Sequence, residues 1–437
     1  MTPADVRPAN AAGWADALRR GLLAFVAMAG LGQALGLAAW ALGAPGIALG
    51  DALRIGWLEF GAFHHVEIEA EGSVAVGAGA EPAPASFAVG VALLSATALA
   101  GWLLFRAGRA VAERAGGGTL ARGLHGAKVA IGYALPALPL ALLVDARVAV
   151  ALGEVVAVEQ RLRLSAWQAV ASPFAIAALA GALGGLRSAF DRDPARLRLL
   201  AAAAAGGWRM LLLALGLSYG GLFLAGVVQP DEPVALLTPA SARYYRETFA
   251  RPEVGVVVLA HHVGLAPNEA AWTLVPAMGG CDGAWGDERA DFLCYGRFPG
   301  SLELLPPGVF PLIDPVGLRF ERAPVGYLLF LLVPTVATVL GGRRAAERIG
   351  TRGRAAVLAG ALSGLAFAAL VAVAAALSLV TVRYELGTDL AGGLVVGPVA
   401  PTGALLALLW GIGGGAAGAA SFRRPASAGS RAGTPPR

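Results

Sequence analysis

Eight long apolar stretches constrain this chain more than any other feature of its sequence. A helix needs about 20 apolar residues to cross a bilayer, and inside lipid only helices or closed barrels satisfy the backbone hydrogen bonds. Hydrophobic residues make up 57% of the chain and charged residues only 14%, against about 25% charged in a soluble domain. We therefore expect an all-α fold, a polytopic integral membrane helix bundle of about eight transmembrane helices. The stretches are Gly21–Leu42, Ser86–Phe105, Val129–Val144, Ala166–Leu186, Met210–Val228, Val325–Gly342, Ala355–Val380 and Gly397–Ala420.

These stretches divide the chain into five regions. The first stretch resembles a signal peptide, but its apolar part is longer than is typical of such peptides, so we interpret it as a retained span. The third contains Pro136 and Pro139 and should be kinked or tilted. The expected regions are a cytoplasmic N-terminal segment (1–20), a first transmembrane half of five spans (21–228), an outer-facing loop region (229–323), a second transmembrane part of three spans (324–420) and a disordered cytoplasmic tail (421–437).

The charges alternate from side to side in step with these spans. Most of the 34 basic residues fall in every second connection, and most of the 29 acidic residues fall in the others. Because basic residues stay on the cytoplasmic side, both termini are predicted to be cytoplasmic, in a bacterial inner membrane. The net charge of +5 is thus a topology signal that points to lipid headgroups and away from nucleic acid. The flanking arginines include Arg106, Arg109, Arg343, Arg344, Arg423 and Arg424.

The spans contain almost no ionisable side chain, which argues against a proton-coupled or ion-coupled transporter. We interpret Gln33 as an interhelical hydrogen-bonding residue. Small residues let helices approach closely in lipid, so the spans should form a compact bundle. The small-residue pairs are Gly32 and Gly36, Gly181 and Gly185, Gly360 and Gly364, and Gly411 and Gly415.

The outer region carries the only two cysteines, Cys281 and Cys294. In an oxidising outer compartment, two cysteines on one short loop favour a disulfide. A metal site is the alternative, but the spacing is not CxxC.

The segment 254–276 should not cross the membrane. It is too short to span before Pro267, and one crossing would invert the sidedness of the last three helices. We expect a re-entrant or interfacial helical hairpin with a turn at Pro267 and Asn268, and with Trp272 at headgroup level.

Two pairs of adjacent histidines fall on the predicted outer face, His64 with His65 and His261 with His262. Imidazoles bind metals and titrate near neutral pH, so a shared metal or pH-sensing site is one hypothesis. Adjacent side chains on a helix point about 100° apart, however, which favours ordinary interfacial histidines. No hydrolase elbow, phosphate loop, HExxH or dinucleotide motif occurs in a suitable context, so we expect no enzyme and no cofactor.

Several segments resemble a bacterial family. They are GDALRIGWLEFGAFHH with the hairpin-like VEIEAEGSVAVGAGAE, LLFRAGRAVAERAGGG, GALGGLRSAF and LAPNEAAW. Together they are similar to actinobacterial multi-spanning membrane proteins of the streptophobe and PerM-like cell-division type. Pro267, Asn268 and Trp272 match that family's Pro-Asn-x-x-x-Trp pattern, whereas MGGCDGAWGDERADFLC replaces its glycine-rich run. The resemblance implies an envelope protein linked to cell division or wall integrity.

Three functional hypotheses follow. The first is a non-enzymatic scaffold or envelope-maintenance factor whose partners are membrane lipids and other membrane or envelope proteins. The second is a permease for lipids or small molecules, which internal symmetry between the first and last four spans would favour. The third is an outer-face pH or metal sensor that uses the paired histidines.

Overall fold

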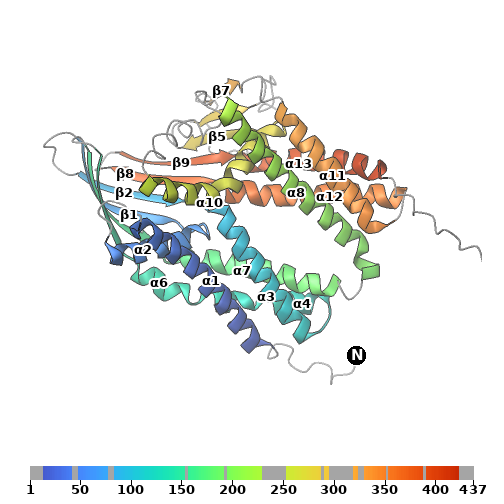
Figure 1. Cartoon of the computed structure of the whole chain (residues 1–437), viewed down its shortest axis with the longest axis horizontal. Coiled ribbons are helices and arrows are strands. Elements are labelled where there is room, and N and C mark those ends of the chain that lie inside the picture. Colours follow the sequence, from blue (N-terminus) through green and yellow to red (C-terminus); the bar gives the residue numbers. More distant parts are fainter. Residues whose placement is uncertain are drawn as a thin grey trace, which may run out of the picture.

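The chain forms two helical bundles that meet one β-sheet (Figure 1). The computed structural model describes residues 13–41, 48–76, 83–152, 156–190, 194–228, 252–286, 290–294, 318–322, 329–350, 353–386 and 390–422.

Within these described residues, seven helical segments are long and apolar enough to cross a membrane, which confirms a membrane helix bundle. They are Trp14–Ala38, Thr119–Leu143, Gln168–Phe190, Arg198–Gly221, Leu329–Ile349, Arg354–Leu377 and Ala400–Ala420. The remaining predicted span, Ser86–Phe105, is not one helix. Its first residues belong to strand β2, and helix α3 runs from Leu94 to Ala115, where its arginines lower its mean hydropathy.

The N-terminal bundle holds the helices up to residue 190. These are α1 (Trp14–Ala41), α2 (Leu49–Ala62), α3, α4 (Thr119–Ala127), α5 (Val129–Ala134), α6 (Ala137–Leu143) and α7 (Gln168–Phe190). The third predicted span is broken where Pro136 lies, between α5 and α6. A core around Met28, Leu104 and Tyr133 joins these helices.

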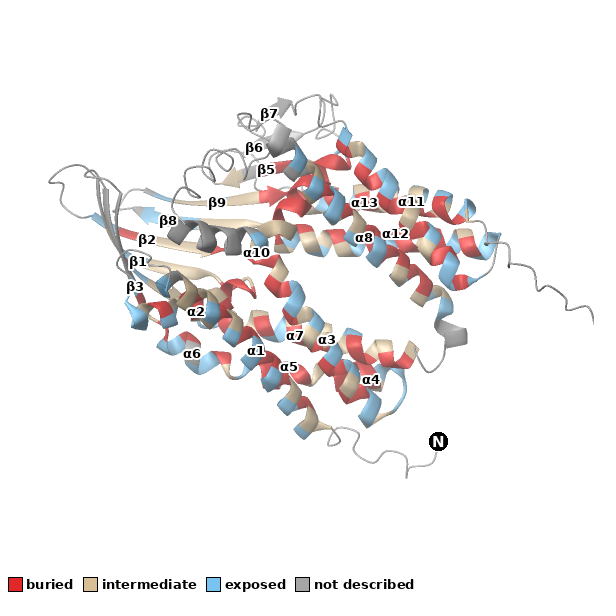
Figure 2. Ribbon diagram, viewed as in Figure 1, coloured by how far each residue is buried: buried red, intermediate tan, exposed pale blue. Residues whose placement is uncertain are grey.

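The C-terminal bundle consists of α8 (Pro194–Val228), α11 (Leu332–Ile349), α12 (Arg354–Leu377) and α13 (Ala400–Ala420). Although α8 precedes the outer region in sequence, it packs against α11 and α12 around Met210 and Phe367. Figure 2 shows the buried residues on the facing helix surfaces within each bundle. Many large apolar side chains point outward, as lipid-facing residues do, for example Trp102, Trp208 and Leu212.

All four predicted outer segments contribute strands to a single nine-stranded sheet, which the sequence did not predict. The strand order is β3-β4-β1-β2-β8-β9-β5-β6-β7, antiparallel except for the parallel pair β6 and β7. The strands are β1 (Ile68–Val76), β2 (Ala83–Gly90), β3 (Ala146–Leu152), β4 (Val156–Leu164), β5 (Cys281–Gly286), β6 (Ala290–Cys294), β7 (Leu318–Arg322), β8 (Val380–Leu386) and β9 (Leu390–Pro398).

The two halves of the chain repeat one unit. Strands β3 and β4 begin at positions 146 and 156, and β8 and β9 begin at positions 380 and 390, so one constant separation relates the two hairpins. We call this separation the repeat offset. The register shifts equally, since position 146 faces 162 and position 380 faces 396. The sheet likewise contains the order β3-β4-β1-β2 and then the matching order β8-β9-β5-β6. Both units begin with a helix running toward the sheet, so the repeat is a parallel one.

Helix packing follows the same repeat. Helix α7 packs against α3 and α4 at Gly181, and α13 packs against α11 and α12 at Gly415, which lies one repeat offset later. A Cβ atom on either glycine would collide with the backbone of a neighbouring helix. The contacting glycines are Gly108 and Gly126 in the first bundle and Gly342 and Gly360 in the second.

Helix α10 (Pro252–Ala277) corrects the predicted hairpin, because it continues through Pro267 without a Pro-Asn turn. A proline in a helix leaves the carbonyl four residues earlier without its N–H donor. That carbonyl belongs to Val263, and it accepts a hydrogen bond from Ser95 Oγ at 2.8 Å. The α3 hydroxyl thus replaces the missing donor, which explains how the helix tolerates this proline.

Candidate outer interaction surface

Helix α10 joins the two bundles at the level where the helices meet the sheet. Leu265 packs on the N-terminal core, whereas Leu274 and Val275 belong to the C-terminal core. Asn268 is 1% exposed. Its Nδ2 donates to Ala92 O at 2.7 Å, and its Oδ1 accepts from Leu94 N at 3.2 Å, so it binds both sides of the β2–α3 junction.

Trp272 makes the matching contact on the second bundle. Its Nε1 donates to Ser378 O, between α12 and β8, at 2.9 Å. Leu379, the residue after Ser378, forms a backbone hydrogen bond with the side chain of His65, which follows α2. Asn268 and Trp272 therefore clamp the two repeats together, a structural role for two of the predicted interaction residues. Pro267 lies inside the same helix, and the side chains of His261 and His262 lie outside the described residues.

His64 is fully buried and uses both ring nitrogens. Nδ1 lies 2.7 Å from Phe60 O, and Nε2 lies 2.6 Å from Tyr133 Oη. Metal binding would require breaking both contacts. Within the described part of the chain, no group of three His, Cys, Asp or Glu side chains is arranged to hold a metal ion.

The burial of His64 predicts a pH-dependent stability. Desolvation lowers its pKa from 6.5 to about 4. At a pH between these two values, His64 is protonated in the unfolded chain and neutral in the folded chain. Stability should fall by about 2 kcal/mol as the pH drops from 7.5 to 5. The His64→Gln variant should lose most of this slope in thermal unfolding measured in detergent. An unchanged slope would contradict the assignment. Burial also lowers the pKa of His65, but Glu67 opposes that shift, so His65→Gln should remove less of the slope and is the matched comparison.

The two cysteines are cross-strand partners, because Cys281 faces Cys294 in the β5–β6 register. Directly opposite residues in antiparallel strands have Cα atoms about 4.5 to 5.5 Å apart, within the range that a disulfide spans. We expect a maleimide-polyethylene glycol reagent to leave the unreduced membrane protein unshifted and to add two groups after reduction. Two additions without a reductant would exclude the disulfide.

The predicted topology arginines that the structure describes lie in the C-terminal halves of α3 and α11. Arg106 stacks 5.0 Å from the centre of the Trp102 ring, and Arg109 pairs with Glu113 at 2.8 Å. In α11, Arg343 is exposed and Arg344 contacts Glu347 at 3.0 Å. Arg423 and Arg424 lie outside the described residues.

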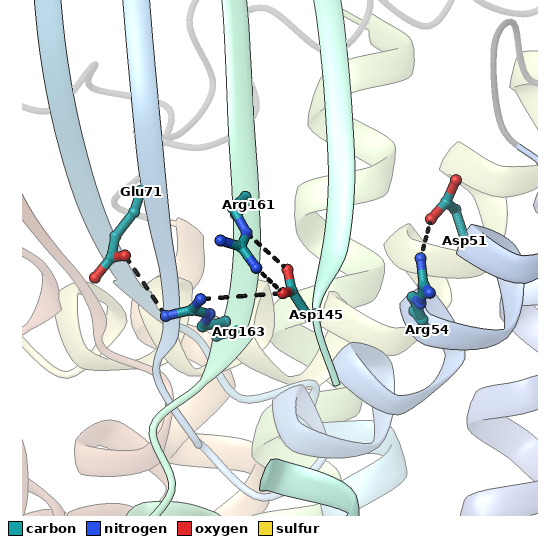
Figure 3. Close-up of polar contacts among 6 residues, drawn as sticks. All are labelled: Asp51, Arg54, Glu71, Asp145, Arg161 and Arg163. Atoms are coloured by element: carbon teal, nitrogen blue, oxygen red, sulfur yellow. Dashed lines mark hydrogen bonds and ion pairs between the residues drawn. The ribbon is translucent and has the colours of Figure 1, made fainter. Parts of the chain in front are cut away.

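One face of strands β1, β3 and β4 carries a charge cluster that the sequence analysis missed (Figure 3). Asp145 contacts Arg161 directly and lies 4.0 Å from Arg163. Arg163 also lies 3.6 Å from Glu71. Arg147 faces Arg161 in the register and completes the cluster. The Arg161 guanidinium, which hydrogen-bonds Asp145, is the main reason that the pKa of this carboxyl is lowered.

A surface depression of about 180 Å³ adjoins this charge cluster. Exposed ion pairs contribute little to stability, about 0 to 1 kcal/mol each, so the cluster is not needed to hold the sheet together. Its signal in the sequence was the alternation of Arg161-Leu162-Arg163-Leu164, a period of two typical of strands. The depression is lined by Glu71, Gly72, Ser73, Arg147, Gln160 and Arg161.

The second repeat lacks this cluster. One repeat offset after Asp145, Arg147, Arg161 and Arg163, the chain has Leu379, Thr381, Val395 and Gly397. The hairpin β8–β9 therefore pairs in the same register without these charges.

No family model matches the chain, and no curated protein or solved structure matches it. The site therefore has to be interpreted from its own geometry. A charged and exposed sheet surface suits recognition of a polar partner.

Proposed function

We propose that this protein is a non-enzymatic membrane scaffold that presents its sheet to the cell envelope. The observation that carries the proposal is the charge cluster, which lies on one of two hairpins that pair in the same register. A feature that the fold does without in one repeat is free to serve recognition in the other. The family resemblance supports a role in envelope maintenance or cell division.

The proposal places the sheet outside a bacterial inner membrane and both termini in the cytoplasm. The basic C-terminal ends of α3 and α11, with Arg114 and Arg348 in their last turns, lie at the end opposite the sheet. Basic connections stay on the cytoplasmic side, which supports this orientation. Lipids and envelope proteins are the expected partners.

The test replaces the four charged residues with the neutral residues that stand at the equivalent positions of the second repeat. The variant Asp145→Leu, Arg147→Thr, Arg161→Val and Arg163→Gly should insert and fold normally in a host that lacks the native gene. We expect it to fail to restore the envelope phenotype of that host. Full restoration by a correctly inserted variant would reject the scaffold proposal.

A second candidate, a permease for lipids or small molecules, is favoured by the repeat. Two helical units share one topology, as in transporters built from parallel repeats. Among the described elements, helix α10 and the pairing of strands β2 and β8 are the main links between the two bundles. The consecutive helices α7 and α8 also contact each other.

The permease candidate predicts movement of a labelled phospholipid across proteoliposomes that contain the purified chain. The four-residue exchange above should leave this activity intact, because it changes only the sheet. No lipid movement above protein-free liposomes would count against the permease.

A further inference from the structure

Two arginines face each other directly on the charged surface. Arg147 on β3 and Arg161 on β4 are cross-strand partners. Like charges in that position destabilise a sheet. Asp145 neutralises Arg161, and Asp145 and Glu71 flank Arg163. Among the described residues, Arg147 makes no ion pair.

The repeat shows that the hairpin does not require this repulsion. The equivalent pair in the second unit is Thr381 facing Val395, in the same register. Asp145 is a single carboxylate that acts on Arg147, Arg161 and Arg163 together, so it offsets only part of the repulsion and the pair needs another source of stabilisation. An anion seated between the two guanidinium groups would supply it.

The local charge balance indicates which anion fits. Arg147 lines the depression without an ion-pair partner in the described chain, so a single negative charge would balance it. Glu69 faces Arg163 in the register and does not line the depression. The depression has room for a small group, and Ser73 on its rim offers a hydroxyl donor. Guanidinium groups hold phosphate oxygens through paired N–H donors, a geometry that arginine provides and lysine does not.

We propose that the Arg147–Arg161 pair binds a phosphodiester monoanion on the outer side of the membrane. The inference rests on the proposed function, because it names the chemistry that the charged surface recognises. Arg147 follows the end of α6 by four residues, about 13 Å along an extended strand. A lipid headgroup below the strand and a phosphodiester polymer of the envelope are the two sources of this group.

The test uses the full chain in phosphatidylcholine nanodiscs. The soluble probe is sn-glycero-3-phosphoglycerol, measured by calorimetry. The lipid probe is phosphatidylglycerol in the nanodisc, measured by counting the lipids that stay bound in native mass spectrometry. Arg147→Gln should lower the affinity for whichever probe binds by about tenfold, and added salt should also lower this affinity. Arg54→Gln is the matched control, because Arg54 is an exposed arginine paired with Asp51 away from the depression (Figure 3).

Binding of the soluble probe without the lipid probe assigns the site to a polymer, because no headgroup then reaches it. Binding of the lipid probe, with or without the soluble probe, assigns it to a headgroup. If neither probe binds, or if Arg147→Gln binds as Arg54→Gln does, the site is overturned. Equal unfolding midpoints for the two variants exclude a folding defect. Complementation by the four-residue exchange reports the scaffold role separately, so either proposal can fail alone.

Discussion

Replacing Asn268 with leucine should destabilise the protein by about 2 to 5 kcal/mol, because two buried backbone groups lose their partners. The side chain is buried and binds Ala92 O and Leu94 N at once. Leucine has a similar size and offers neither a donor nor an acceptor. The carbonyl and the amide at the β2–α3 junction would stay desolvated and unsatisfied. Thermal unfolding of the purified protein in detergent measures the effect.

The matched control is Thr273→Val on the same helix. Thr273 is also buried, but its hydroxyl donates only to Glu269 O within α10. We expect this change to cost less than about 1 kcal/mol. If the two variants were equally stable, Asn268 would not clamp the junction.

The transmembrane helices were predictable because their cause is local. A run of apolar residues long enough to span lipid has no other stable environment, so hydropathy alone finds it. The same reasoning failed at Ser86, because a strand of Ala, Phe and Val is as apolar as a helix. Only pairing with β1 and β8, which are distant in sequence, decides between the two.

The sheet was missed for the same reason. Each hairpin is short and its strands are only 5 to 9 residues long, so each segment by itself is short enough to be interpreted as a loop. Stability comes from joining hairpins that belong to four segments far apart in the sequence. The hairpin-like segment 66–81 was recognised from the sequence, and β1 lies within it.

The prediction of a Pro-Asn turn in α10 was wrong because the contact that lets the helix continue through Pro267 is also non-local. Proline predicts a break from the sequence alone. The donor that replaces its missing N–H is Ser95, on a different helix, and Asn268 is used to hold the next element rather than to turn the chain. The charge cluster was overlooked because its members come from separate strands that only the sheet brings together.

The repeat is visible in the sequence at a few positions, at the C-terminal ends of α3 and α11 and at the close helix contacts. Ala112-Glu113-Arg114 recurs as Ala346-Glu347-Arg348, one repeat offset later. Lipid-facing positions accept any apolar residue, so the residues at equivalent positions of the two repeats differ there. Close helix contacts accept only glycine, so the glycines recur. The glycines that end α3 and α11, Gly116 and Gly350, keep the same separation for a backbone reason, because both have a positive φ that favours glycine.

Close packing at Gly415 leads to the second large prediction. Gly415→Val should destabilise the protein by about 3 kcal/mol, near the top of the range for overpacking. A Cβ there would collide with the backbone of α12 at Gly360 and would lie 3.0 Å from Met210 Cε on α8. Unlike the end of a flexible side chain, a helix backbone yields only when the whole helix moves. Thermal unfolding in detergent measures the loss.

The control lies two residues away on the same helix. A Cβ at Gly413 meets no atom within 4 Å, so Gly413→Val should change stability by less than about 1 kcal/mol. If the halves are true repeats, Gly181→Val should cost as much as Gly415→Val, because both glycines contact one glycine on each of two helices. Equal stability of the Gly413 and Gly415 variants would refute the packing, and a harmless Gly181→Val would refute the equivalence of the two bundles.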